Sequence, residues 1–237
     1  LAVGVYFVRK TFNKELELAQ EKKNFILSVT HELKTPIASS KLFAETILSR
    51  DIAKEKRDDI LDKIIKDQTR LEKLVENILL ISKVEAHEQH LEIEKVNCHE
   101  FIKSVIKGLD FSESTNFDID AKIEIKIDRF YFTSVIQNLH ENAIKYSKDN
   151  AGVVWSAQQL GNSICIQIKD QGIGVPANQR EKIFDLFHRI GDENTRDTKG
   201  TGVGLYIVQK IVALHKGTIK AKENQPKGSI FEIELPQ

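Results

Sequence analysis

The spacing of apolar residues along the first ninety positions predicts two long helices. From Thr11 to about Ser49 only Pro36 interrupts helix-compatible sequence, and residues 52–88 contain neither proline nor glycine. Within both segments, apolar or small residues recur at alternating intervals of three and four, which is the spacing of a heptad seam, with one polar layer at Asp67 in the second segment. The seam positions are Ile26, Thr30, Leu33, Ile37, Ser40, Ala44 and Ile47, followed by Ile60, Ile64, Asp67, Leu71, Leu74, Ile78 and Ile81. The pattern predicts a helical hairpin that turns near residues 49–51.

A hairpin of this kind has an apolar seam but cannot enclose a core of its own. Two copies that join along their seams form a four-helix bundle, so we expect a homodimer. The alternative is a monomeric hairpin packed on the rest of the chain. Pro36 removes one backbone hydrogen bond, to the carbonyl of Glu32, and tends to kink a helix. We expect that weak point to couple signals arriving through residues 11–24 to the segment around it.

After a polar connector at residues 86–95, the pattern changes to alternating strands and helices. Short strand-like runs with apolar alternation are separated by turn residues and by longer helical segments. The predicted strands are 121–127, 152–157, 163–169, 218–221 and 229–235, and the predicted helices are 99–108, 129–147 and 202–214. The expected fold is therefore an α-helical hairpin forming a dimeric four-helix bundle, followed by an α/β sandwich.

Composition excludes several classes of protein. The chain has 237 residues, of which 41% are hydrophobic and 30% charged, and this is typical of a folded globular protein. Lys plus Arg and Asp plus Glu balance at 35 each, and no basic stripe interleaved with aromatic residues occurs, so we expect no nucleic-acid partner. Cys98 and Cys165 stand far apart in apolar contexts, which indicates buried, reduced thiols.

The chain begins with an apolar run, Leu1–Val8, that ends at Arg9-Lys10. The run is far shorter than the roughly 20 residues that span a bilayer. One interpretation is the start of an amphipathic helix. We favour the cytoplasmic end of a truncated membrane helix, because the run stops sharply at two cations and the chain lacks an initiator Met. The protein is then expected at the cytoplasmic side of the cell membrane.

His31 is the first candidate for chemistry. At about 100° per residue, it projects from nearly the opposite face of the helix to the apolar seam, so its ring should be accessible to solvent. Thr35, one turn later, shares that face, and Glu32 sits to one side, where it can take a proton from the ring. An exposed histidine beside a glutamate is most often ordinary solvated surface, so His31 needs a partner site elsewhere in the chain.

Four blocks in the second half of the chain supply that partner site. They are Asn138–Ser147, Asp170–Gly174, Phe184–Phe187 and Gly200–Leu205. Together with His31-Glu-Leu-Lys-Thr-Pro36, and in this order, they resemble the H, N, G1, F and G2 boxes of the sensor histidine kinases of two-component signalling. The resemblance runs from about residue 24 to the C-terminus.

The resemblance implies a division into three parts. Residues 1–23 would be the end of a membrane helix and a signalling helix, and residues 24–90 the dimerisation and histidine phosphotransfer domain. Residues 91–237 would be a catalytic ATP-binding domain, with the fold shared by histidine kinases and gyrase-type ATPases.

On the predicted helix 129–147, Asn138, Asn142 and Tyr146 recur every fourth residue and share a face, with Lys145 beside them. A row of amides is a poor core stripe, but it suits Mg²⁺ that keeps some waters and bridges nucleotide phosphates. By resemblance, Asn142 is the Mg²⁺ ligand and Asn138 supports it. Lys145 approaches the phosphates of ATP, and Tyr146 packs near the adenine.

Asp170 ends a predicted strand and is followed by Gly172 and Gly174, which permit close backbone approach to a ligand. By resemblance, the Asp170 carboxylate accepts the adenine amino hydrogen. The polar run 191–199 is interpreted as a lid that closes over ATP.

Further residues frame that lid. Phe184 and Phe187 would anchor it, although an aromatic pair at this spacing is more often simple core. By resemblance, Arg189 extends toward the γ-phosphate. Three glycines, Gly200, Gly202 and Gly204, lie at the start of the predicted helix 202–214. The backbone N–H groups at this end of the helix would therefore face the phosphates.

The sequence therefore predicts an ATP-dependent protein-histidine kinase. It should autophosphorylate on His31, pass the phosphoryl group to an aspartate of a response regulator, and use Thr35 to dephosphorylate that regulator. The alternative is an ATPase or a nucleotide-binding scaffold of the same fold without phosphotransfer. An ATPase would hydrolyse labelled ATP without becoming labelled itself, whereas a kinase would carry the label.

Overall fold

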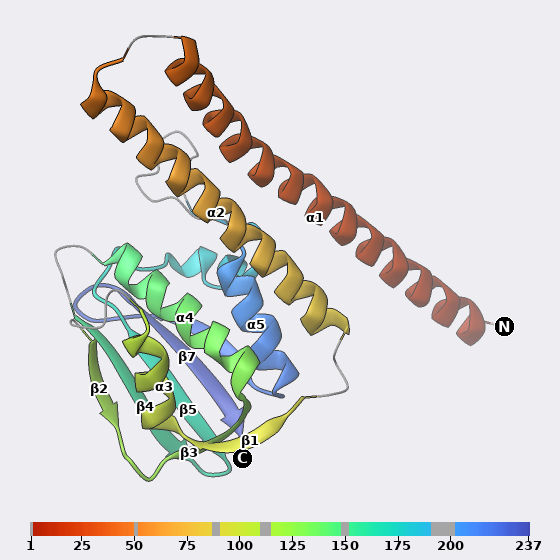
Figure 1. The fold of residues 1–237 in the computed structure, drawn as a ribbon. Coiled ribbons are helices and arrows are strands. Elements are labelled where there is room, and N and C mark those ends of the chain that lie inside the picture. The colour runs from red at the N-terminus through yellow and green to blue at the C-terminus, as the bar shows by residue number, and fades with distance from the viewer. Residues whose placement is uncertain (1, 50–51, 87–90, 110–114, 148–151, 191–201) are drawn as a thin grey trace. The chain divides into compact units, whose positions relative to one another are not determined.

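A computed structural model describes the chain except for residues 1, 50–51, 87–90, 110–114, 148–151 and 191–201 (Figure 1). The chain divides into two compact units, Leu1–Glu76 and Asn77–Gln237. The division falls inside the second helix, so the last turns of that helix belong to the second unit.

The first unit contains the predicted helical hairpin. Helix α1 spans Ala2–Ser49, and helix α2 spans Lys54–Ala86. The helix α1 starts earlier than the Thr11 expected from the sequence and continues without a break through Pro36. The turn predicted near residues 49–51 falls largely outside the described residues. Among the described residues, no helix is both long and apolar enough to cross a membrane.

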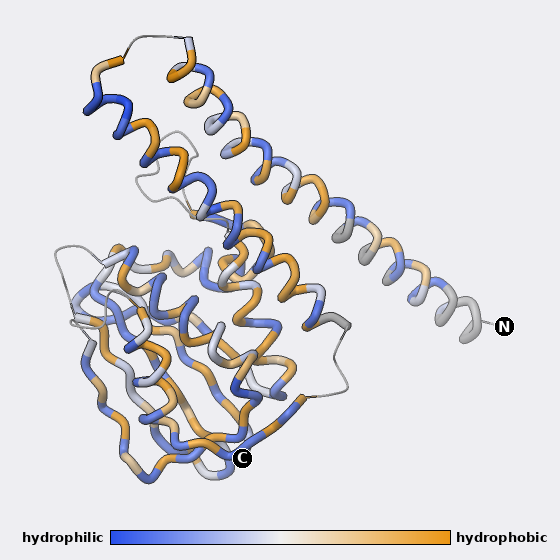
Figure 2. The backbone as a smooth tube through the Cα atoms, viewed as in Figure 1, coloured by the Kyte–Doolittle hydropathy of each residue, from blue (hydrophilic) through white to orange (hydrophobic). Residues whose placement is uncertain are grey.

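The seam predicted for α2 is confirmed by burial. Ile60, Leu74 and Ile81 are buried, and the other four seam positions are half-buried. The seam predicted for α1 is only partly correct. Of its positions, Ser40 is buried, but Ile26 and Ile37 remain 62% and 54% exposed. One α2 helix therefore leaves part of the apolar surface of α1 uncovered, because Ile26 and Ile37 stay more than half exposed. Hydrophobic residues recur along both helices (Figure 2).

The second unit is an α/β sandwich, as predicted. Its main sheet has the order β2-β4-β5-β7-β6, with β2 parallel to β4 and the other neighbours antiparallel. Strands β1 and β3 form a separate antiparallel pair. The strands are β1 Ile93–Asn97, β2 Thr115–Ile119, β3 Glu124–Asp128, β4 Val153–Leu160, β5 Ser163–Lys169, β6 Thr218–Glu223 and β7 Ser229–Pro236.

Three helices lie over one face of the main sheet (Figure 1). They are α3 Cys98–Lys107, α4 Arg129–Tyr146 and α5 Gly204–Leu214, and two short 3-10 turns, η2 Ala177–Gln179 and η3 Lys182–Phe184, precede α5. The core between the layers is apolar. Trp155 on β4, Ile166 on β5 and Phe132 on α4 are fully buried there. Because alternate residues of β5 point to opposite faces, its isoleucines line the core.

Local side chains define the starts of two of these helices. The Asn97 side chain accepts a hydrogen bond from the backbone N–H of Glu100, which caps α3. The Asp128 carboxylate accepts from the N–H groups of Phe130 and Tyr131, which caps α4. Such caps satisfy backbone donors that a helix leaves unpaired at its first turn.

Several predicted boundaries were wrong. Strand β1 lies partly within the stretch expected to be a polar connector, and β2 was not predicted. Both strands are short and half-exposed, so their apolar pattern is weak. They pair with β3 and β4, which lie further along the chain. Strand β3 begins at Glu124, because Asp120 first forms a turn with Lys122 and Ile123. Helix α5 begins at Gly204, since Gly202 has a positive φ of 70°.

Both cysteines are buried and unpaired, as expected. Burial raises the pKa of Cys98 to about 12, so its thiol stays protonated at neutral pH.

Candidate functional site

His31 lies exposed on α1, as the sequence predicts. Thr35 is also exposed on that helix, and its Oγ1 donates a hydrogen bond of 3.3 Å to the backbone carbonyl of His31. The structure therefore brings the imidazole and the hydroxyl to one face of the helix, one turn apart. This arrangement leaves the ring of His31 accessible from solvent.

Glu32 has a different partner from the one expected. Its carboxylate Oε2 lies 2.8 Å from a guanidinium nitrogen of Arg70 on α2, and the Arg70 and Glu32 side chains are only 25% and 15% exposed. Among the described residues, Glu32 forms its ion pair with Arg70 and not with His31. Sequence reasoning missed Arg70, which stands 38 positions further along the chain.

The predicted polar row of α4 lies at the border between core and solvent. Asn138, Asn142, Lys145 and Tyr146 are half-buried, whereas neighbouring positions such as Leu139 are fully buried. The row is thus one face of α4, as the four-residue spacing predicts.

Two members of this row have defined partners. The Asn138 amide nitrogen donates to the carbonyl and the hydroxyl of Ser134, at 2.8 and 3.1 Å. Lys145 extends over the ring of Tyr146, with its Nζ 4.7 Å from the ring centroid and 3.2 Å from the hydroxyl. The positive charge of Lys145 is therefore held at the C-terminal end of α4, beside the residue expected to contact adenine.

Asp170 follows β5 and is buried. One carboxylate oxygen, Oδ1, accepts hydrogen bonds from the backbone N–H of Gly172 at 2.8 Å and from that of Ser229 at 3.1 Å. Burial raises the pKa of Asp170, and these hydrogen bonds oppose the rise. The carboxylate is thus fixed in orientation by backbone donors in a poorly solvated place.

The glycine turn after Asp170 meets the end of α4. A Cβ atom on Gly172 would collide with the backbone carbonyl of Tyr146, and the Ile173 N–H donates to that carbonyl at 3.3 Å. Gly174 has a φ of 76°, a conformation that favours glycine. Both predicted glycines are therefore required by the backbone geometry.

The glycines before α5 complete the cluster. A Cβ on Gly202 would lie 2.8 Å from the backbone of Phe187, whose N–H donates to the Gly202 carbonyl at 3.0 Å. A Cβ on Gly204 would overlap the side-chain oxygen of Asn138. The N-terminus of α5 thus touches the polar row of α4. Gly200 lies outside the described residues.

Sequence reasoning missed the turn between β6 and β7. The Asn224 side chain donates to the Asp170 carbonyl at 2.7 Å, and Asp170 and Ser229 share a backbone hydrogen bond of 3.0 Å. A side chain on Gly228 would collide with the Asp170 carbonyl. The Pro-Lys-Gly sequence after Asn224 is a turn signal that could have indicated this segment.

The predicted lid, residues 191–199, lies outside the described residues, but its N-terminal flank is described. Phe184 is buried and packs edge-on against Phe231. Phe187 and Arg189 are half-buried. His188 is hydrogen-bonded through Nε2 to the Gln179 side chain at 2.9 Å.

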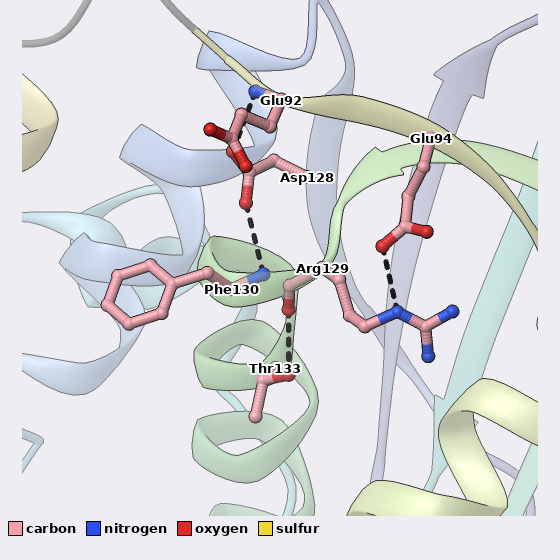
Figure 3. A pocket seen from close by; sticks show the side chains of 6 residues that line it. All are labelled: Glu92, Glu94, Asp128, Arg129, Phe130 and Thr133. Atoms are coloured by element: carbon pink, nitrogen blue, oxygen red, sulfur yellow. Dashed lines mark hydrogen bonds and ion pairs between the residues drawn. The ribbon is translucent and has the colours of Figure 1, made fainter.

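A separate pocket of about 410 Å³ lies at the opposite end of α4 (Figure 3). Its lining is mostly charged, and several of its polar groups are already paired. Arg129 binds Glu94, and Asp128 accepts from the backbone of Glu92 and of Phe130. The pocket contains none of the predicted nucleotide-binding residues.

Two family models match the chain. Residues 21–87 match the His Kinase A (phospho-acceptor) domain, and residues 127–237 match the histidine kinase-, DNA gyrase B-, and HSP90-like ATPase family. The first match contains His31. The second contains the polar row of α4 and the turns at Gly172, Gly202 and Gly228.

Curated relatives align along nearly the whole chain. It is 33% identical to the sensor protein RprX of Bacteroides fragilis over 94% of its length, which is 45% of that protein. It is 32% identical to the sensor protein kinase WalK of Staphylococcus aureus over 98% of its length, and this covers 58% of WalK. The chain therefore spans about half the length of the curated relatives that it matches.

Solved structures share the fold. The Acinetobacter baumannii histidine kinase AdeS has a TM-score of 0.69 at 24% identity, covering 87% of this chain and 97% of AdeS. The histidine kinase ThkA in complex with the response regulator protein TrrA gives a TM-score of 0.69 at 22% identity, covering 90% and 61%.

Proposed function

This chain belongs to the sensor histidine kinases, and we propose that it uses ATP to phosphorylate itself on His31 and then phosphorylates an aspartate of a response regulator. One observation carries the proposal. An exposed histidine on the phosphoacceptor hairpin occurs in the same chain as a helix, α4, whose polar face meets Gly204 at Asn138 and the turn after Asp170 at Tyr146.

In the proposed reaction, the γ-phosphoryl group moves from ATP to His31, and Glu32 takes up the proton that the ring loses. A ring nitrogen of neutral His31 attacks the γ-phosphorus of ATP, the bond from that phosphorus to the β–γ bridging oxygen breaks, and ADP leaves. The proton on the other ring nitrogen passes to the Glu32 carboxylate. The product is phosphohistidine, from which an aspartate carboxylate of the regulator takes the phosphoryl group. Such transfers depend mainly on positioning and charge neutralisation.

The nucleotide site is assigned to the cluster around α4. Asp170 accepts the adenine amino hydrogen, because a carboxylate has about four acceptor positions and its N–H partners at Gly172 and Ser229 leave some of them available. Tyr146 packs near the adenine. Lys145, Arg189 and the N–H groups at the start of α5 face the phosphates.

A Mg²⁺ ion is expected with the ATP. The half-exposed amide of Asn142 offers a hard oxygen ligand on the same face as Asn138, and such a donor fits an ion that keeps several waters. Bound Mg²⁺ would neutralise charge on the transferred phosphate.

The protein is proposed to act as a homodimer through the hairpin. On α1, Ile26 and Ile37 are more than half exposed, and on α2, Leu61, Ile65 and Val75 are 44%, 62% and 47% exposed. These residues form stripes that one hairpin leaves in water, at a cost of about 25 cal/mol per Å² of apolar surface. A second hairpin covers them in a four-helix bundle.

The proposed partner is the receiver domain of a response regulator. ThkA, which has the same fold, was solved with the response regulator TrrA, and this supports such a partner. Dephosphorylation of the regulator is assigned to Thr35, beside His31. Attachment of the protein to the cytoplasmic side of a membrane through residues 1–8 stays a prediction.

Incubation with γ-labelled ATP and Mg²⁺ tests the proposal. Label should enter the protein, resist base, and be lost in acid. His31→Gln should abolish labelling while nucleotide binding persists. Label that persists in this variant, or that maps to His140 or His188, contradicts the assignment of His31. Release of labelled phosphate without labelled protein would favour the ATPase alternative.

A further inference from the structure

The Glu32–Arg70 ion pair joins the two helices of the hairpin beside the proposed phosphoacceptor. The two charged atoms are 2.8 Å apart, which is the distance of a charge-assisted hydrogen bond. Both side chains are largely buried, so solvent screens the pair less than it screens a surface pair. The residues are far apart in the sequence, and only the folded hairpin brings them together.

The pair fixes the direction of the Glu32 carboxylate. Consecutive helix residues project about 100° apart, so His31 and Glu32 point from different sides of α1. His31 is exposed, whereas the carboxylate of Glu32 points to Arg70 on α2. A general base must lie about 2.6–3.2 Å from the proton that it removes. A carboxylate bound to Arg70 is therefore directed away from the ring that it is expected to serve.

The backbone next to this pair has one weak point. Pro36 stands on the turn after Glu32 and has no N–H, so the Glu32 carbonyl lacks its helical hydrogen bond. The turn that carries the carboxylate can consequently shift at a lower cost than an intact helical turn.

We propose that Arg70 is a positioning residue that restrains autophosphorylation by holding the Glu32 carboxylate inside the hairpin, so that the transfer to His31 requires the ion pair to open. The inference rests on the proposed function, because it assumes that His31 is the phosphoacceptor and Glu32 its proton acceptor. Arg70 itself does not touch the reacting atoms and acts only through Glu32.

Arg70→Gln in the complete 237-residue chain tests the proposal. It should increase the rate of phosphohistidine formation at saturating ATP about three- to tenfold, which corresponds to roughly 0.7–1.4 kcal/mol. The KM for ATP should not change, because the nucleotide residues lie in the other unit. Arg70→Lys keeps the charge and should remain near the wild-type rate. The thermal unfolding of each variant, followed by circular dichroism, verifies that the hairpin is intact.

A double-mutant cycle shows whether the effect passes through Glu32. A Glu32→Gln background retains only the slower labelling that proceeds without this proton acceptor. It has no carboxylate to release, so Arg70→Gln should not accelerate that residual rate. An equal acceleration in that background overturns the proposal. So does an Arg70→Gln variant that labels at the wild-type rate or more slowly. Wild-type protein that takes up no label contradicts the proposed function, whereas a labelled wild type without a faster Arg70→Gln variant contradicts this inference alone.

Discussion

The side-chain oxygen of Asn138 on α4 occupies the place that a Cβ atom on Gly204 would need at the start of α5. The two residues are 66 positions apart in the sequence, and their contact joins the asparagine row to the glycine turn. Any side chain at position 204 would have to displace Asn138.

Gly204→Ala should therefore weaken nucleotide binding about tenfold or more. The added methyl must displace Asn138 or the N-terminus of α5, and overpacking of this kind typically costs about 1–3 kcal/mol. Calorimetric titration with a non-hydrolysable ATP analogue and Mg²⁺ measures the loss. Gly108→Ala is the matched control, since a Cβ there meets its nearest atom, the Val105 carbonyl oxygen, at an ordinary 3.5 Å. Equal affinities for the two variants would contradict the assigned contact.

Asp170→Asn should separate function from stability. Burial raises the pKa of Asp170, so the folded state binds the proton more tightly than the unfolded chain does. The stability that this group contributes is lost as the pH rises through the folded-state pKa, and the ionised carboxylate is a net cost at neutral pH. An asparagine retains an oxygen for the N–H groups of Gly172 and Ser229 without that cost.

The Asp170→Asn variant should thus unfold at an equal or higher urea concentration at pH 7.5 while its affinity for the ATP analogue falls at least about tenfold. Fluorescence of Trp155, the single tryptophan, reports unfolding of its unit, because its side chain is completely buried. A variant that unfolds more easily than the wild type would show that the carboxylate has a structural role instead.

His215 should make the second unit less stable in mild acid. Its Nδ1 donates to the Ile211 carbonyl at 2.7 Å, and its Nε2 accepts from the Asp128 N–H at 2.9 Å, so the ring is neutral. Burial lowers the pKa of His215, although the Ile211 hydrogen bond and the Asp128 charge oppose this. Below pH about 6.5, the histidine is protonated in the unfolded chain but stays neutral in the folded state. The free energy of unfolding therefore falls as the pH is lowered.

The measurement is the urea midpoint of Trp155 fluorescence at pH 7.5 and pH 5.5. His215→Gln should lower the midpoint at pH 7.5 but reduce the further loss at pH 5.5. Gly108→Ala should keep the wild-type pH dependence. If His215→Gln keeps the full acid sensitivity, another group is responsible for it.

Ile65→Asp should convert the homodimer into a monomer. Ile65 is 62% exposed within one hairpin, and a partner hairpin would bury it, so a charge there would lose its solvation. Light scattering coupled to size exclusion gives the mass directly. Lys66→Asp, one position further and on another side of α2, should remain dimeric. A monomeric wild type at micromolar concentration would contradict the proposed bundle.

Thr35→Ala should retain autophosphorylation and transfer but lengthen the lifetime of the phosphorylated regulator. The Thr35 hydroxyl can hold a water near an aspartyl phosphate docked at His31, and kinase chemistry does not require this hydroxyl. Its present hydrogen bond to the His31 carbonyl is a long 3.3 Å, so little is lost when it opens.

The assay follows labelled regulator over time, and Thr35→Ser, which keeps a hydroxyl, is the control. Loss of kinase and phosphatase activity together would mean that Thr35 shapes the helix before Pro36. An unchanged regulator lifetime would remove Thr35 from dephosphorylation.

Much of the architecture was readable from the sequence. The heptad spacing predicted both long helices, and strict alternation gave β5 its correct bounds, Ser163–Lys169. The exposure of His31 also followed from its position opposite the apolar seam. These features depend on helical and strand periods that lie within one segment, so neighbouring residues suffice to predict them.

Only the tertiary structure decided which residues meet. It paired Glu32 with Arg70, set Asn138 against Gly204, and brought the Asn224 turn to Asp170. It also showed which side of α1 one hairpin leaves exposed. Each of these relationships joins residues separated by dozens of positions, and a local pattern of polarity contains no information about which distant segment will fill the adjoining space.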